Sequence, residues 1–589
     1  MMRPLSTRHC ERSEAIQSLI DQYRANGSGL LRRYAPRNDG GWVFGCLILT
    51  SSFLVPTAHA TECSTAVLTA LGVPGVAIAS AEAKADGNGP PLCDVKGTLT
   101  TTGEGAPDGA ARFEVRLPAQ WNGKVLFLGV GGFGGNLYPS VTRTDLLAAS
   151  AGNFATAITD TGHEGLNANA SWALVKPGVA DDAKLTDYYF RAVHEVAVTA
   201  KQLIQGYFGK SPAKSYFDGC SNGGRQALME ASRYPDDFDG IVAGAPFMDF
   251  KAILAGTRLY QHLLKPSAYV PAALLPAVDR AMLASCDAAD GVKDGLVQNP
   301  AQCALDLKSL ICKPGEGENC LNAEQAGALE TYFTATRAET GRYLFPGSAN
   351  TDLQGAGMNV WSVGVTAPDD VNAVEPWGSQ GPDHTPYAWQ FADSMIKYIV
   401  ERDPNFDLRT FRFDDASIGL FAERTGAANA DDPARLAPFI AKGKKLLLYH
   451  GFSDPALAPL RTVKFYEDLA AANGGYERLQ GTVRLFMVPD MQHCASGPGP
   501  NSFDTLTALV SWVEQGKAPD AISARHFAGN DPDHPVDRTM PLCPFPTAAT
   551  YKGQGDVDSA ENWSCLPNQE LLEVGKAGAD AGLTVQKQE

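Results

Sequence analysis

The segment 219–223 reads Gly-Cys-Ser-Asn-Gly and constrains the fold more than any other stretch of the chain. It fits the pattern G-x-S-x-G, in which a serine stands at a sharp turn from a strand into a helix. Residues 215–218 before it are short, aromatic and strand-like, and residues 225–231 after it are good helix formers. Flanking glycines let the backbone of such a turn approach its neighbours closely. This context predicts a nucleophile at Ser221 rather than a purely structural turn.

Short apolar segments alternate with helical patterns on both sides of this motif. An amphipathic helix is expected from Asp187 to about Gly206, and another near 461–472. Strands are expected at 112–117, 124–128, 154–159, 240–244, 444–449 and 482–488. Strand–helix alternation predicts a doubly wound, mostly parallel sheet. Together with the serine motif, it indicates an α/β-hydrolase fold.

The alternation stops between about Met248 and Pro438, where cysteines, prolines, Asp-Gly turns and scattered tryptophans replace it. We interpret residues 248–438 as a large lid domain inserted between two parts of the core, 61–247 and 439–589. The Gly- and Ala-rich stretch from Thr61 to about Gly109 is expected to lie over the surface.

Residues 1–60 are expected to contribute nothing to the fold. Three arginines at 32, 33 and 37 precede an apolar run, Trp42 to Val55, and the small-x-small triplet 58–60 follows. This order is typical of a secretion signal cleaved after Ala60, and the run is too short to span a bilayer comfortably. The stretch before Arg32 reads like translated non-coding sequence, which places the true start downstream. The chain is therefore predicted to be secreted or periplasmic, without membrane association after cleavage.

The composition and net charge limit which classes of binding partner are expected. The 589 residues carry a net charge of −17, which disfavours a nucleic-acid partner. A hydrophobic content of 44% fits a globular protein with a sizeable core. The oligomeric state is not readable from the sequence.

Ten of the 12 cysteines lie beyond residue 60, and an even number in an exported chain predicts disulfides. Sequence proximity favours four pairs, Cys63–Cys93, Cys286–Cys303, Cys312–Cys320 and Cys543–Cys565. Cys220 and Cys494 are left over. If they pair, their Cα atoms lie roughly 5.5 Å apart, which brings Ser221 and His493 within reach of each other.

A catalytic serine needs a histidine to take its proton and a carboxylate to orient that histidine. In α/β-hydrolases these residues follow in the order Ser, Asp/Glu, His, on loops at the carboxyl ends of strands. Asp454 follows strand 444–449, and His493 follows strand 482–488. We predict Ser221 as nucleophile, Asp454 as acid and His493 as base. Asp490 is the rival acid, but it lies on the histidine's own loop and would have to fold back.

The oxyanion hole is expected to use the backbone N–H of Asn222 and one from the glycine-rich turn after strand 124–128, at Gly131 or Gly132. The alternative is that this turn serves only as a tight connection between a strand and a helix.

The lid contains an acidic loop with three aspartates within eight residues. Carboxylates this close repel one another unless a cation holds them, and oxygen ligands suit Ca²⁺. The alternative is a solvated acidic turn. The predicted ligands of a structural Ca²⁺ are the side chains of Asp287, Asp290 and Asp294 and the carbonyls of Val292 and Leu296.

Together these segments resemble the tannase and feruloyl esterase family, which also includes the hydrolase of mono(2-hydroxyethyl) terephthalate. The resemblance spans about 95 to 565 and is carried by residues 219–225, 287–296, 450–455, 492–494 and 541–544. It implies a secreted serine esterase with a calcium-bearing lid. It also implies that a Cys220–Cys494 disulfide flanks the triad, and it supports the other four pairs and the calcium ligands.

The expected activity is hydrolysis of esters of hydroxylated aromatic acids, with small aromatic esters as substrates. Lid aromatics that could stack on the ring are Trp361, Tyr387, Trp389 and Phe391; the alternative for each, which a single aromatic residue favours, is a place in the hydrophobic core. One alternative is a terephthalate monoester hydrolase, which in this family depends on a lid arginine facing the free carboxylate; the sequence does not assign that role to Arg402, Arg409 or Arg412. A peptidase, a lactonase and a catalytically silent binding protein are further alternatives.

Overall fold

The computed structural model describes residues 62–568 except 86–90, 301–302, 304, 316–318, 350, 354–356, 379 and 382–383. The expected leader, 1–60, lies outside the described residues, as does the chain beyond 568.

The described strands form one large sheet in the order β1-β2-β3-β5-β4-β8-β9-β12-β13. From β5 to β13 neighbouring strands run parallel, and β3 pairs antiparallel with both β2 and β5. This is the mostly parallel sheet that the sequence predicts. The strands are β1 (Val76–Ala85), β2 (Pro91–Thr101), β3 (Gly109–Pro118), β4 (Lys124–Leu128), β5 (Ala155–Thr159), β8 (Lys214–Cys220), β9 (Gly240–Gly244), β12 (Lys445–Gly451) and β13 (Val483–Val488).

Both faces of the sheet are buried along its central strands, because successive side chains of these strands enter different cores. In β4, Phe127 belongs to one apolar cluster, and Leu126 and Leu128 belong to the other. On the first side pack α5 (Ala192–Phe208), α6 (Asn222–Arg233) and α13 (Pro459–Ala472), and on the second α3 (Arg143–Ala151) and α15 (Thr505–Gln515). Covering helices on both faces account for the long apolar runs of the central strands.

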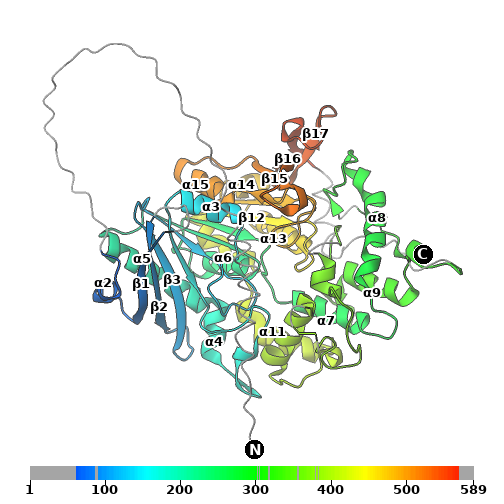
Figure 1. Ribbon diagram of the computed structural model, residues 1–589, viewed down its shortest axis with the longest axis horizontal. Coiled ribbons are helices and arrows are strands. Elements are labelled where there is room, and N and C mark those ends of the chain that lie inside the picture. The colour runs from blue at the N-terminus through cyan, green and yellow to red at the C-terminus, as the bar shows by residue number, and fades with distance from the viewer. Residues whose placement is uncertain are drawn as a thin grey trace, which may run out of the picture.

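The expectation for the segment from Thr61 to about Gly109 is wrong. Residues 76–85 and 91–101 form two long strands, β1 and β2, which extend the sheet antiparallel at its edge (Figure 1). Residues 79–85 alternate alanine with polar side chains, and alanine gives a weaker contrast between a buried and an exposed face than a large apolar residue would. The disulfide Cys63–Cys93 ties this edge to the preceding segment.

The regular elements of the chain between β9 and β12 are mainly helices, and this segment lies to one side of the sheet (Figure 1). Its main elements are α7 (Ala252–Leu263), α8 (Leu275–Cys286), α9 (Ala323–Phe333), β10 (Thr336–Arg337), β11 (Tyr343–Phe345), α10 (Tyr387–Ser394), η8 (Met395–Glu401), α11 (Asp415–Thr425) and α12 (Ala437–Ala441). This segment corresponds to the predicted lid, whose boundaries at 248 and 438 stay a prediction.

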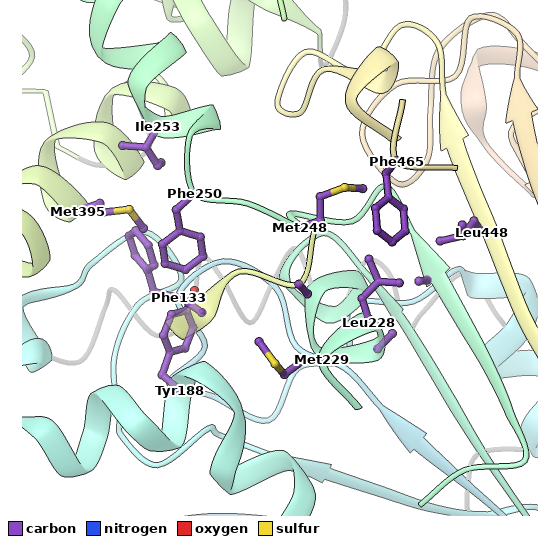
Figure 2. Close-up of a cluster of buried hydrophobic side chains, with 14 of the residues drawn as sticks. Phe133, Tyr188, Leu228, Met229, Met248, Phe250, Ile253, Met395, Leu448 and Phe465 are labelled. Atoms are coloured by element: carbon purple, nitrogen blue, oxygen red, sulfur yellow. The ribbon is translucent and has the colours of Figure 1, made fainter. Parts of the chain in front are cut away.

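The lid and the core share one apolar cluster. Leu228 and Met229 of α6 lie near Met248 and Phe250, and Ile253 and Met395 continue the cluster into the lid (Figure 2). Because the apolar packing continues from the core into the lid, it holds the lid against the carboxyl ends of the strands. Within the described part of the chain, none of the helices combines the length and the apolar character needed to span a bilayer.

After β13 the chain adds two small antiparallel sheets. They consist of β14 (Ser502–Phe503), β15 (Ile522–Phe527) and β16 (Val536–Leu542), and of β17 (Thr547–Tyr551) and β18 (Trp563–Pro567). The disulfide Cys543–Cys565 links the end of β16 to β18 and so connects the two small sheets. Shorter elements elsewhere are α2 (Thr65–Ala70), β6 (Leu174–Lys176), β7 (Val179–Ala180), α4 (Asp182–Thr186) and α14 (Tyr476–Leu479).

Candidate active site

Ser221 stands between β8 and α6 with φ 63° and ψ −124°, a conformation that side-chain-bearing residues rarely adopt. Its backbone N–H donates to the carbonyl of Gly244 at 3.0 Å. A Cβ on Gly219 would lie 2.5 Å from the backbone carbon of Gly223, and one on Gly129 would lie 2.7 Å from the Cα of Gly223. The glycines of the motif are therefore required by close backbone approach, as a strained serine turn demands.

His493 and Asp454 meet at the carboxyl ends of two adjacent parallel strands, β13 and β12. His493 Nδ1 lies 2.7 Å from Asp454 Oδ2. The other oxygen of Asp454 accepts hydrogen bonds from the backbone N–H groups of Ala456 at 2.8 Å and Leu457 at 2.9 Å. The carboxylate is thus held on one side by the backbone and aimed at the imidazole on the other.

A second histidine, which the sequence alone does not mark as functional, contacts the same carboxylate. His450 Nε2 lies 3.0 Å from Asp454 Oδ2, and its Nδ1 lies 2.8 Å from the hydroxyl of Thr462. His450 is fully buried at the end of β12. The only sequence signal for this contact is its spacing of four residues before the acid.

Asp454 is buried, yet its charged form is favoured. Burial alone would raise the pKa of this carboxyl, but the neighbouring imidazoles of His493 and His450 and their hydrogen bonds hold the pKa well below its usual value. Asp454 is therefore a carboxylate across the ordinary pH range, as the orienting member of a triad must be.

Asp490, the rival acid, has other partners. It accepts hydrogen bonds from the hydroxyls of Ser453, at 2.8 Å, and Thr351, and from the backbone N–H of Val297 at 2.6 Å. Burial raises the pKa of Asp490 to about 6. Its carboxyl thus links the histidine loop to the lid, and His493 is paired with Asp454 instead.

The structure contains all five disulfides that proximity and the family resemblance suggested. Cys220 and Cys494 are joined with a Cα–Cα distance of 6.0 Å across a sequence separation of 274 residues. Since these cysteines adjoin Ser221 and His493, the bridge fixes the two loops against each other. Ser221, Asp454 and His493 all line one pocket.

The predicted oxyanion residues also line this pocket. Asn222 is the first residue of α6, where backbone N–H groups have no partner within the helix. Its side-chain amide donates to the carbonyl of Val130 at 3.0 Å, and its Oδ1 accepts from Arg225 Nε at 2.8 Å. Gly132 has φ +57°, which favours glycine. Asn222 and Gly132 thus reach the pocket from two different loops.

Arg225 is a positioning residue that the sequence does not single out. Its guanidinium is fully buried and donates to the carbonyls of Tyr188 at 2.9 Å and Tyr189 at 2.7 Å. Through its bond to Asn222 it holds the first turn of α6, next to Ser221. A lone arginine after a glycine pair carries no sequence signal for such burial.

The pocket lies between the carboxyl ends of the strands and the lid, and the space within its walls, open to solvent, is about 960 Å³. Trp361 and Phe391 line it, with ring planes 11° apart, and the Trp361 ring meets His493 edge-on at 5.1 Å. The other two candidate aromatics differ: Tyr387 contacts Trp361 at 5.3 Å without lining the pocket, and Trp389 is buried in the lid.

Among the described residues that line the pocket, none is lysine or arginine. The three lid arginines named above lie elsewhere. Arg409 pairs with Asp407 at 2.6 Å, Arg412 is exposed and lies 3.3 Å from Glu339, and Arg402 ends η8 away from the pocket wall. The described wall of the pocket thus contains no lysine or arginine to pair with a substrate carboxylate.

The acidic loop fits a hard cation. Asp290 and Asp294 each have one buried side-chain oxygen without a hydrogen-bond partner, and burial raises the pKa of Asp290 to about 6. Asp287 Oδ1 accepts from the backbone N–H groups of Asp294 and Gly295, both at 3.0 Å. In the structure the three carboxylates do not all come within 4.8 Å of one another, so binding one ion through all three would require their side chains to move closer together.

Comparisons with known proteins agree with this geometry. Residues 93–566 match the family described as "Tannase and feruloyl esterase". The mono(2-hydroxyethyl) terephthalate hydrolase of Piscinibacter sakaiensis is 33% identical over 529 residues, covering 81% of this chain and 85% of that protein. A probable feruloyl esterase of Arthroderma benhamiae is 32% identical over 461 residues, covering 76% of this chain and 81% of that protein.

Solved structures agree as well. Feruloyl esterase B from Aspergillus oryzae superimposes with a TM-score of 0.70 at 26% identity, covering 84% of this chain and 97% of that chain. The tannin acyl hydrolase from Aspergillus niger, at 20% identity and a TM-score of 0.66 over 88% of this chain and 97% of that chain, supports the fold alone. The chain therefore belongs to the tannase and feruloyl esterase family of carboxylic ester hydrolases.

Proposed function

We propose that this protein is an exported serine esterase that cleaves esters of hydroxylated aromatic acids through an acyl-enzyme. The observation that carries the proposal is the contact between His493 and Asp454 in the pocket that also contains Ser221. Five disulfides support export to an oxidising compartment.

In the proposed reaction, Ser221 Oγ attacks the ester carbonyl while His493 Nε2 takes the hydroxyl proton. Asp454 accepts the Nδ1–H bond of His493 and stabilises the imidazolium that forms. The N–H groups of Asn222 and Gly132 donate to the oxyanion of the tetrahedral intermediate. His493 then protonates the departing alcohol, and a water molecule activated by the same imidazole releases the acid.

The side chains that line the pocket favour an aromatic substrate without a charged substituent over one that carries a free carboxylate. Trp361 and Phe391 offer ring faces and edges, and the hydroxyl-bearing side chains of Thr331, Thr334 and Thr336 form part of the wall. A free carboxylate placed here would lose its hydration without gaining a cationic partner. This observation disfavours the alternative of a terephthalate monoester hydrolase.

A substrate panel tests the proposal. Purified enzyme is assayed with methyl ferulate, methyl gallate, mono(2-hydroxyethyl) terephthalate and the neutral diester bis(2-hydroxyethyl) terephthalate, each at the same concentration. A peptide amide is assayed in parallel. We expect kcat/KM for the neutral esters to exceed that for the terephthalate monoester by at least about tenfold, or 1.4 kcal/mol. Equal or faster cleavage of the monoester would contradict the neutral-ring proposal, and cleavage of a peptide amide alone would contradict the esterase.

The acidic loop is proposed to hold a structural Ca²⁺ through the side chains of Asp287, Asp290 and Asp294 and the carbonyls of Val292 and Leu296. Bound there, the ion would supply positive charge that offsets the repulsion of the carboxylates and would order the loop. It takes no part in ester hydrolysis in this proposal, since the triad residues lie in a separate pocket.

A further inference from the structure

Three potential metal ligands lie close together where α5 and α6 pack on one face of the sheet, outside the active-site pocket and the acidic loop. They are His194 of α5, Glu230 of α6 and Asp237, which follows α6. One ligand atom from each lies within 4.8 Å of the other two. His194 Nδ1 is 2.6 Å from Asp237 Oδ2, so the imidazole is already oriented by one carboxylate.

Glu230 makes this cluster more than an ordinary ion pair. The residue is 1% exposed, and neither carboxylate oxygen has a hydrogen-bond partner. A buried carboxylate facing a second carboxylate is costly unless a proton or a cation lies between them.

One of the protein's own cations, Lys201, contacts the cluster at Asp237 and forms no ion pair with Glu230. Its Nζ donates to the backbone carbonyl of Asp237 and lies 3.9 Å from Asp237 Oδ1. Arg233 pairs with Glu104 at 2.8 Å and stacks on the ring of Phe190. In the described part of the chain no lysine or arginine forms an ion pair with Glu230.

We propose that His194, Glu230 and Asp237 bind a divalent transition-metal ion of the Zn²⁺ or Mn²⁺ class. One imidazole and two carboxylates form a mixed nitrogen and oxygen donor set, which suits these ions better than Ca²⁺. The His194 ring stacks on Tyr234 at 3.7 Å, which restricts its orientation as supporting contacts do at metal sites. The His194 side chain is 29% exposed, which provides a route of entry.

The proposed ion would join two elements that support the nucleophile. α6 begins beside Ser221, and Glu230 lies on the same helix two turns later. His194 lies on α5, the helix that packs beside it. Coordination would therefore fix α6 to α5 and to the loop at Asp237, and its measurable effect is on stability rather than on the chemical step.

The test uses metal binding and thermal stability, with saturating Ca²⁺ present throughout so that the acidic loop does not contribute. Purified protein is stripped with a chelator, the chelator is removed, and Zn²⁺ or Mn²⁺ alone is titrated by calorimetry and by thermal shift. We expect one equivalent to bind and the Tm to rise. His194→Gln and Glu230→Gln are expected to weaken binding at least about tenfold, whereas the control His534→Gln, at an exposed histidine, keeps the full response.

The competing explanation is a proton shared between Glu230 and Asp237. In that case Glu230→Gln replaces one neutral group with another, and neither the variant nor the wild type responds to the metal. No metal-dependent rise in Tm in the wild type would overturn the proposal, as would an undiminished rise in Glu230→Gln. Loss of the response in both ligand variants, with retention in His534→Gln, would support it.

Discussion

The imidazole of His493 and the carboxylate of Asp454 lie 2.7 Å apart because the strands before them, β13 and β12, are parallel neighbours. Loops at the carboxyl ends of such strands meet at one edge of the sheet. The pairing of Gly451 with Val488 sets the register that brings the two loops level. The contact thus depends on sheet topology, and several tests of the proposed chemistry follow from it.

Replacing the nucleophile tests the role of Ser221. Ser221→Ala removes the attacking oxygen and is expected to lower kcat by about 10³-fold or more. The fold should persist, because alanine at φ 63° bears the same backbone strain as serine. Turnover of methyl ferulate is measured alongside circular dichroism, and a well-folded variant with full activity would reject the assignment.

The two candidate acids are separated by a pair of amide substitutions. Asp454→Asn cannot stabilise the His493 imidazolium and is expected to lower kcat by about 10³- to 10⁴-fold. Asp490→Asn serves as the matched control on the neighbouring loop and should keep most of the activity, because its carboxyl contacts Ser453 and Thr351 instead. The reverse ranking in steady-state kinetics would make Asp490 the acid.

Burial of Asp490 is also expected to make the free energy of unfolding depend on pH. Its pKa is raised from 3.8 to about 6 by burial, so the neutral carboxyl is favoured in the folded state. The stabilising contribution is complete below the unfolded pKa and is lost as the pH rises through about 6.

The side-chain amide introduced by Asp490→Asn mimics the neutral carboxyl at every pH. This variant should therefore lose less stability than the wild type between about pH 4 and 7, by up to roughly 3 kcal/mol. Urea unfolding at several pH values measures this difference. Parallel curves for the two proteins would contradict it.

The Cys220–Cys494 bridge is expected to matter for both stability and activity. Closing a loop of 274 residues contributes on the order of 5 kcal/mol in the chain-entropy model, against about 2.5 kcal/mol for the 8-residue separation of Cys312 and Cys320. The double alanine variant at 220 and 494 should therefore lose more stability than the one at 312 and 320. It should also lose kcat, since the serine and histidine loops are no longer fixed together. Equal kcat values in the two variants would show that the bridge has no positioning role.

Removing the proposed Ca²⁺ should affect stability more than rate. Excess calcium chelator is expected to lower the Tm, while the initial rate at low temperature falls much less, because the acidic loop lies outside the pocket. Asp294→Asn removes one proposed ligand and should blunt the response to chelator. A melting curve that does not move with chelator would argue against a structural ion in this loop.

The sequence predicted the parallel strands because each is a short, continuous apolar run, as in 124–128 and 444–449. It missed β1, where alanine alternates with polar residues after Ile78, and β2, which mixes polar and apolar residues. These strands are held by pairing of β1 with β2 and of β2 with β3. The triad candidates were accessible from their order and from the ends of strands. The contact of His450 with Asp454 and the division of lid aromatics into pocket wall and lid core depend on tertiary packing, which no local pattern encodes.

The position of the lid within the chain has a consequence for biosynthesis. Ser221 precedes the lid segment and His493 follows it, so a ribosome synthesises the proposed nucleophile long before its proposed proton acceptor. In the proposed mechanism the nascent chain cannot hydrolyse an ester until the part after the lid has been made and has docked. The Cys220–Cys494 disulfide, which joins the two loops, also forms only after that point.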